Sequence, residues 1–117
     1  MPLAQLLYPP PTDDGLATWL HDNLRHHEAL IQAINTKFGT SLTIATPIWP
    51  LNPKDETQLA IFNRAHQFLH NEMAQVLGIQ NQDVSDLKFT EKRDLDAFMF
   101  IHFQEHQAAA QACGMPV

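Results

Sequence analysis

Two segments of the chain repeat each other at a constant offset of 36 residues, and the repeat is centred on histidine. Residues 59–78 and 95–114 share seven of 20 positions without a gap. The shared positions are Leu59/Leu95, Phe62/Phe98, His66/His102, His70/His106, Ala74/Ala110, Gln75/Gln111 and Gly78/Gly114. Spacings of three and four residues place side chains on one face of an α-helix. The repeat therefore predicts two copies of one amphipathic helix.

A weaker third copy precedes these two. Trp19 aligns with the two phenylalanines, Asn23 with the first histidine of each pair, and His27 with the second. An aromatic residue, a polar residue and a histidine thus recur at positions i, i+4 and i+8 in all three segments. The sequence predicts an all-α fold of three long helices in a small bundle, with the three aromatic residues at related buried positions.

The boundaries of the helices follow from capping residues and glycines. Each expected helix begins near a side chain that can accept hydrogen bonds from its first amides, and each ends at a glycine. The expected helices are Thr12 or Asp13 to Phe38, Asp55–Leu77 and Glu91–Cys113, in repeat units of about 12–39, 55–78 and 91–114. The expected capping residues are Thr12, Asp13 and Asp14 for the first helix, Asp55 or Asn52 for the second, and Thr90 for the third. A chain of 117 residues suits one domain, which we place at 12–117.

The two connections, 40–54 and 79–90, are too apolar for solvated loops, and we expect both to be extended and packed over the helices. The segment Ser41–Thr46 alternates polar and apolar residues as a short strand does. A helix of about 23 residues is about 35 Å long, and about twelve extended residues reach about 40 Å. Either connection is therefore long enough to return along the bundle, so parallel and antiparallel helices are both compatible with the sequence. The apolar residues concerned include Leu42, Ile44, Val84, Leu87 and Phe89.

Residues 1–11 are predicted to form an extended N-terminal arm, because apolar side chains are followed by three prolines. The candidate partner-binding residues of this arm are Leu3, Leu6, Leu7 and Tyr8. The arm is expected either to dock on a neighbouring subunit or to be a frayed or folded-back terminus. In the first case the protein is a homo-oligomer or part of a larger assembly, with protein partners.

Composition argues against several classes of function. The net charge is −6 and the seven Lys and Arg residues are mostly dispersed, which does not favour nucleic acid. No apolar run approaches the roughly 20 residues of a membrane helix, and the start lacks the basic region of a secretory signal. Cys113, the single cysteine, is interpreted as a core residue. The sequence contains no recognisable catalytic constellation, so we assign no catalytic residue and do not expect an enzyme. We expect the protein to be located in a virion or in the cytoplasm.

The histidines of the repeat allow three interpretations. On helical wheels His66 and His102 fall within the apolar faces, and His70 and His106 at their edges. The rings can form a hydrogen-bonded polar seam, without a cofactor. The four can instead hold zinc or another transition metal, because histidines at i and i+4 can share an ion. Buried histidines can also act as a pH switch. Glu72 and Glu105 are expected to point away from this face.

The segment His-Asn-Glu-Met-Ala-Gln-Val-Leu-Gly-Ile at 70–79, a polar segment with Asp83 and Asp86, and the group Phe98, His102, Glu105 and His106 before Gly114 form one pattern. Over about residues 55–116 this pattern resembles small uncharacterised proteins of tailed-bacteriophage structural modules. The resemblance implies a virion component at a head–tail or tail interface and assigns no site residues. The expected function is thus a non-enzymatic structural or interaction protein. The alternative is a small His-rich helical metal-binding protein.

Overall fold

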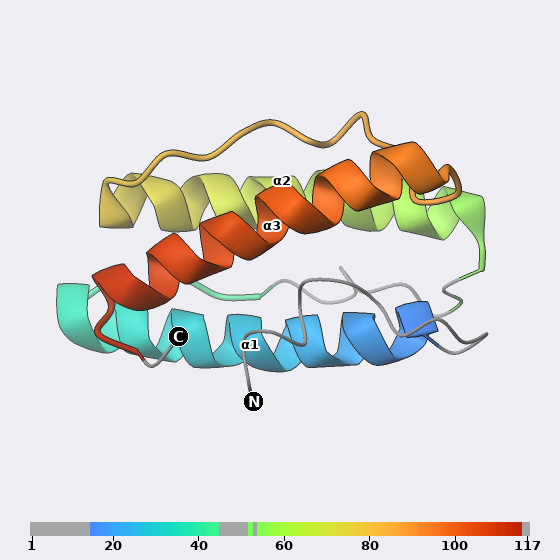
Figure 1. The fold of residues 1–117 in the computed structure, drawn as a ribbon. Helices are drawn as coiled ribbons and strands as arrows, with labels where there is room; N and C mark the ends of the chain where they lie inside the picture. Colours follow the sequence, from blue (N-terminus) through green and yellow to red (C-terminus); the bar gives the residue numbers. More distant parts are fainter. Residues whose placement is uncertain (1–14, 45–51, 53, 116–117) are drawn as a thin grey trace.

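The computed structural model describes residues 15–44, 52 and 54–115, and three α-helices make up most of this part (Figure 1). They are α1 (Gly15–Phe38), α2 (Glu56–Leu77) and α3 (Lys92–Ala112). The predicted all-α bundle is confirmed, since the described ranges contain no strand. Residues 41–44, where the alternation suggested a strand, have no regular structure. The expected capping residues of the first helix, Thr12, Asp13 and Asp14, lie outside the described residues.

Local sequence explains where α2 begins and ends. The Asp55 carboxylate accepts hydrogen bonds from the backbone N–H groups of Thr57 and Gln58, at 2.9 and 3.1 Å. These bonds satisfy amides that have no partner inside the helix. Gly78 ends the helix with φ +67°, and its N–H donates to the Ala74 carbonyl at 2.8 Å. Both boundaries were predicted from the sequence, and both are confirmed.

The beginning of α3 differs from the prediction. Glu91, not Thr90, is the residue before the first turn, and no side chain caps the helix. The Asp94 carboxylate in the first turn instead accepts a hydrogen bond from the backbone N–H of Lys88, at 3.0 Å. A negative charge at this place also complements the helix dipole. The predicted Thr90 cap is wrong because this carboxylate anchors the turn before the helix.

The three helices run in the same direction, and the α2–α3 connection returns along the bundle (Figure 1). One apolar cluster joins the first halves of the helices: Trp19, Leu20, Leu59, Phe62, Phe98 and Met99, with Val84 and Phe89 of the connection. A second cluster joins their last halves: Leu30, Ile31, Ile34, Leu69, Met73, Ala109 and Ala110. At this end Lys37 Nζ donates to the Ala112 carbonyl at 2.8 Å. Equivalent parts of the three helices therefore meet at the same level.

The parallel arrangement stacks the repeat in layers across the bundle. The aromatic layer consists of Trp19, Phe62 and Phe98, all with no exposed area, as predicted. Below it lie two polar layers, which separate the aromatic layer from the second apolar cluster. The upper polar layer consists of Asn23, His66 and His102, and the lower one of His27, His70 and His106. The repeat thus delivers one side chain from each helix to each layer.

The α2–α3 connection, residues 78–91, packs along the bundle as expected. Asn63 Nδ2 donates to the carbonyls of Val84 and Leu87, at 2.9 and 3.1 Å. The Val84 N–H donates to Gln67 Oε1 at 2.9 Å. These bonds fix the connection to α2 on a stripe beside the histidines. In the first connection, the part that the structure describes places Leu42 and Ile44 against the second apolar cluster.

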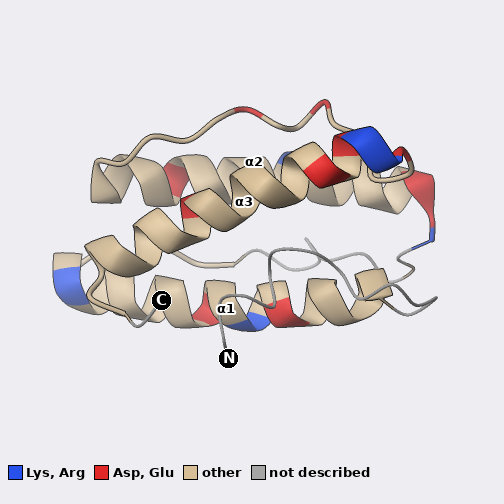
Figure 2. Ribbon diagram, in the orientation of Figure 1, with Lys and Arg blue, Asp and Glu red and all other residues tan. Residues whose placement is uncertain are grey.

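The charged side chains lie outside the core. Figure 2 shows Lys and Arg spread over the three helices, without one face that gathers them. Ile61, Phe68 and Phe100 are the large apolar side chains most exposed among the described residues, together with Phe38. None of the described helices has the length and apolar character needed to cross a membrane.

Candidate metal centre

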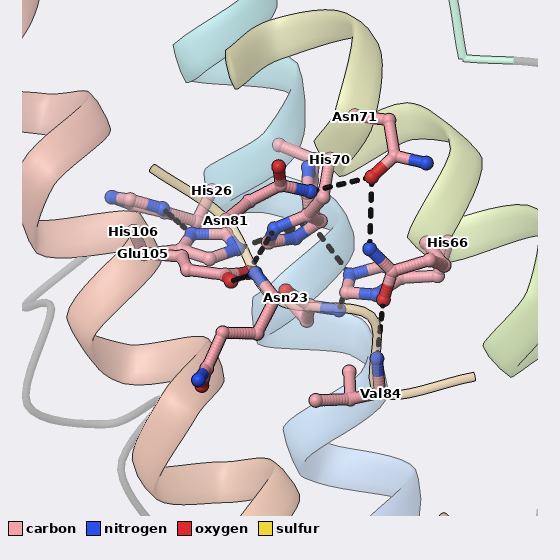
Figure 3. A network of polar contacts seen from close by, with 12 residues as sticks. Asn23, His26, His66, His70, Asn71, Asn81, Val84, Glu105 and His106 are labelled. Carbon is pink, nitrogen blue, oxygen red and sulfur yellow. Dashed lines mark hydrogen bonds and ion pairs between the residues drawn. The ribbon is translucent and has the colours of Figure 1, made fainter. Parts of the chain in front are cut away.

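Five buried histidines meet in the middle of the bundle, and we call them the histidine cluster. Figure 3 labels His66, His70 and His106 of this cluster among the neighbouring polar groups. They are His27, His66, His70, His102 and His106. One nitrogen of each ring lies within 4.8 Å of the corresponding nitrogens of the other four. All five residues are at most 5% exposed. The structure therefore brings together the four predicted histidines and adds His27 from α1.

The Nε2 atom of His27 lies at the centre of this cluster. It is 2.8 Å from His66 Nε2, 3.2 Å from His70 Nε2 and 3.1 Å from His106 Nε2. An imidazole nitrogen carries either one proton or one lone pair, so a single nitrogen cannot form three good hydrogen bonds. Nitrogens bound to one ion at about 2.1 Å are separated by roughly 3.0–3.4 Å. The contacts at 3.1 and 3.2 Å fall in this range, and the contact at 2.8 Å is slightly shorter.

His102 is buried without a hydrogen bond to either ring nitrogen from the described residues. Its ring stacks on Phe98, with centroids 5.3 Å apart and planes at 15°, and it lies against Trp19 at 5.1 Å. Leaving a buried polar group unsatisfied costs about 1–3 kcal/mol. A cation bound in the cluster would satisfy one of these nitrogens.

Two neighbouring groups orient the rings from outside the cluster. His70 Nδ1 lies 3.0 Å from Glu105 Oε1, and Glu105 Oε2 accepts a hydrogen bond from the Gln82 N–H at 2.8 Å. His106 Nδ1 lies 2.6 Å from His26 Nδ1. A carboxylate that accepts the Nδ1 proton leaves the Nε2 lone pair free for a metal, as is usual around metal-bound histidines. Glu105 thus supports the cluster.

The expectation that Glu105 points away from the histidines was wrong. On its own helix Glu105 does lie off the aligned face, but the neighbouring helix supplies the partner. Because α2 and α3 are parallel and in register, His70 of α2 lies beside Glu105 of α3. Reasoning on single helical wheels cannot find a contact between helices.

Burial favours the neutral form of four of the five rings. Loss of solvation lowers the pKa values of His27, His66, His102 and His106 well below 6.5, and repulsion from neighbouring rings lowers them further. A neutral imidazole is the form that binds metal ions. Near neutral pH these four rings therefore offer lone pairs to a metal ion without first losing a proton.

Sequence reasoning missed parts of this site. His27 and Asn23 were recognised as the third copy of the repeat but were not assigned as ligands, although their register contained the signal. His26 does not occupy a repeat position, so nothing in the sequence pattern pointed to it as a neighbour of the site. The arm residues Leu3, Leu6, Leu7 and Tyr8 lie outside the described residues. Cys113 packs against the second apolar cluster as expected, and burial raises the pKa of its thiol despite the opposing charge of Lys37.

Two cavities of very different size lie near the cluster. A cavity of about 10 Å³ touches His70, Glu105 and His106. Such a volume holds roughly one water molecule at most. A larger cavity, of about 300 Å³, lies on the outer side of Glu105, between the α2–α3 connection and α3. The rings themselves are enclosed, which suits a bound ion. Comparisons with family models, with curated proteins and with solved structures find no match to this chain.

Proposed function

We propose that this protein binds one transition-metal ion in the histidine cluster, which makes it a small His-rich helical metal-binding protein. The observation that carries this proposal is the convergence of Nε2 atoms. His27 Nε2 lies within 3.2 Å of the Nε2 atoms of three histidines from the two other helices. Imidazole ligands suit zinc, copper, iron and nickel.

The ion would act on the fold as a cross-link. Each of the three helices contributes at least one ligand, so an ion in the cluster ties α1, α2 and α3 together at their midpoints. Because the unfolded chain cannot present these ligands together, the binding energy adds to the stability of the fold. The closed environment favours tight retention of the ion over catalysis.

The structural or virion function predicted from the sequence remains a prediction. It depends on an N-terminal arm that lies outside the described residues. A metal-stabilised helical domain is compatible with such an assembly role, but no contact among the described residues favours it. The metal site is therefore the function that the geometry supports best.

Elemental analysis tests this proposal. The protein is purified without a histidine tag from medium supplemented with iron, cobalt, nickel, copper and zinc, and the metal content per chain is measured. We expect about one ion per chain. A chelator should remove this ion, and added metal should restore it. His27→Gln and His66→Gln should lose the ion.

The matched control is His21→Gln, because the side chain of His21 is 62% exposed and lies outside the cluster. This variant should retain the ion. Circular dichroism checks that each variant keeps its helices. A wild-type protein that stays metal-free in supplemented medium, and takes up no added ion, would contradict the proposal.

A further inference from the structure

The two polar layers contain six groups, and only five of them are histidines. The sixth group is Asn23, which occupies in α1 the position that His66 and His102 occupy in α2 and α3. Its amide Nδ2 lies 3.1 Å from His66 Nε2 (Figure 3). Three parallel helices thus present two stacked triangles of polar groups. Two stacked triangles are also the arrangement of the six donors around a six-coordinate ion.

The amide of Asn23 is only partly satisfied. The side chain is fully buried, and its Oδ1 has no hydrogen-bond partner among the described residues. Rotating the amide by 180° exchanges its oxygen and nitrogen, which are assigned by their hydrogen bonds alone. In the rotated form Oδ1 faces the cluster at the place of Nδ2. The only polar group of the two layers that is not an imidazole can therefore offer an oxygen ligand.

The number of buried donors favours six ligands over four. With bonds of about 2.1 Å, adjacent donors of an octahedral ion are roughly 3.0 Å apart and opposite donors roughly 4.2 Å apart. The short contacts of the cluster, 2.8 to 3.2 Å, are close to the separation of adjacent donors. The largest separation, up to 4.8 Å, exceeds that of opposite donors, so the outer rings would move inward around a bound ion. A tetrahedral ion takes four donors at roughly 3.4 Å from one another. It would leave one buried imidazole, as well as Asn23, without a role.

We infer that Asn23 supplies the sixth ligand of the metal centre, so that the site holds a divalent ion by five imidazole nitrogens and one amide oxygen. This inference rests on the proposed metal site. It assigns the ion to the class that favours six-coordination with nitrogen donors, namely Fe²⁺, Co²⁺ or Ni²⁺, in preference to Zn²⁺, which is usually four-coordinate in structural sites.

The test uses Co²⁺ as the probe, because its visible bands are weak in six-coordinate sites and intense in tetrahedral ones. The full-length, metal-free protein is titrated with Co²⁺, and competition then gives the affinities for Ni²⁺ and Zn²⁺. We expect the weak bands of a six-coordinate ion in the wild type. Asn23→Leu, which has similar size and no donor, should change the spectrum to that of a lower coordination number.

Asn23→Leu should also lower the preference for Ni²⁺ over Zn²⁺ by about tenfold or more, since even groups outside the ligand set change metal affinity by 10- to 100-fold. Asn23→His supplies an imidazole at the equivalent position and should restore the six-coordinate spectrum. Asn63→Leu is the control, because it removes another buried asparagine, one that binds the α2–α3 connection. Its spectrum should match the wild type.

Three results would overturn the inference. If the wild type gives intense tetrahedral bands, or if Asn23→Leu matches the wild type, the metal site stands and Asn23 is not a ligand. Should Asn23→Leu fail to fold, Asn23→His decides alone, because a spectrum unlike that of the wild type would contradict a ligand at this position. No uptake of Co²⁺, Ni²⁺ or Zn²⁺ by the wild type would overturn the proposed function itself.

Discussion

His27 Nε2 lies 2.8 Å from His66 Nε2 across the interface between α1 and α2, with both rings buried and each pKa lowered by burial. Only one of the two nitrogens can donate a proton to the other, and His27 uses the same atom toward two further rings. Burial in this core therefore disfavours protonation of these two rings and leaves lone pairs that a metal ion can bind. This relationship links the stability of the protein to pH and to metal.

The stability of the metal-free protein should fall as the pH decreases below about 6.5. Because the pKa values of His27, His66, His102 and His106 are lowered in the fold, the unfolded chain binds more protons. The stability is complete above the unfolded pKa and is lost as the pH falls through it toward the folded value. Each extra proton contributes a slope of about 1.4 kcal/mol per pH unit.

Urea unfolding in the presence of a chelator, between about pH 5 and 7.5, measures this dependence. Replacing both His66 and His102 with Gln should flatten the curve. The variant His21→Gln changes an exposed histidine and should leave the slope of the stability–pH curve unchanged. An identical slope in the double variant would show that these two rings are already protonated or accessible to solvent in the fold.

Phe62 should be essential for stability, and Phe68 dispensable. Phe62 has no exposed area and stacks on His66, with centroids 4.9 Å apart, whereas Phe68 is 65% exposed on the same helix. Phe62→Ala should cost about 3–5 kcal/mol through the cavity it leaves. Phe68→Ala should change stability by less than about 0.5 kcal/mol. Equal effects in denaturant unfolding would mean that the register of α2 is wrong.

Asn63 should hold the α2–α3 connection in place. Asn63→Ala removes two hydrogen bonds to the carbonyls of Val84 and Leu87, which should cost about 1–3 kcal/mol. Hydrogen exchange of the amides between residues 82 and 89 should become faster, while that of α1 stays slow. Gln75→Ala, at an exposed position of the same helix, serves as the control. Unchanged exchange would contradict this anchoring role.

The repeat predicted much of the fold because its spacing identifies the buried face and the end of each single helix. Leu59, Phe62 and His66 reveal one buried face by their spacing alone, and Gly78 marks the end of α2. The direction of the helices was open, since it depends on how long connections are used and not on local pattern. In the structure the parallel direction is shown by the hydrogen bond from Lys37 to Ala112, which joins the carboxyl ends of α1 and α3, and by the connection that runs back along α2.

The site was predicted only in part for the same reason. The offset of 36 residues identified His66, His70, His102 and His106, but these lie on two helices. The remaining helix, α1, carries a weaker copy of the repeat, in which Asn23 replaces one histidine. Only the parallel packing at a common level shows that His27 completes the cluster and that Glu105 reaches His70.

The N-terminal arm should contribute to assembly and not to the fold of the helical domain. Deleting residues 1–10 should leave the helix content unchanged, because the described residues of both apolar clusters already join the three helices to one another. Exposing Leu3, Leu6, Leu7 and Tyr8 costs roughly 25 cal/mol per Å² of apolar surface, which docking would recover. Light scattering of the full and shortened chains tests this expectation. Loss of helical structure on deletion would show that the arm belongs to the core.

X-ray absorption spectroscopy of the metal-loaded protein tests the central claim most directly. With Ni²⁺ or Co²⁺ bound in a one-to-one ratio, we expect a shell of nitrogen or oxygen neighbours at about 2.0–2.2 Å, together with the outer-shell scattering of several imidazole rings. His27→Gln should weaken both signals. A shell of oxygen neighbours without imidazole scattering would place the ion on surface carboxylates and contradict a metal centre built from the histidine cluster.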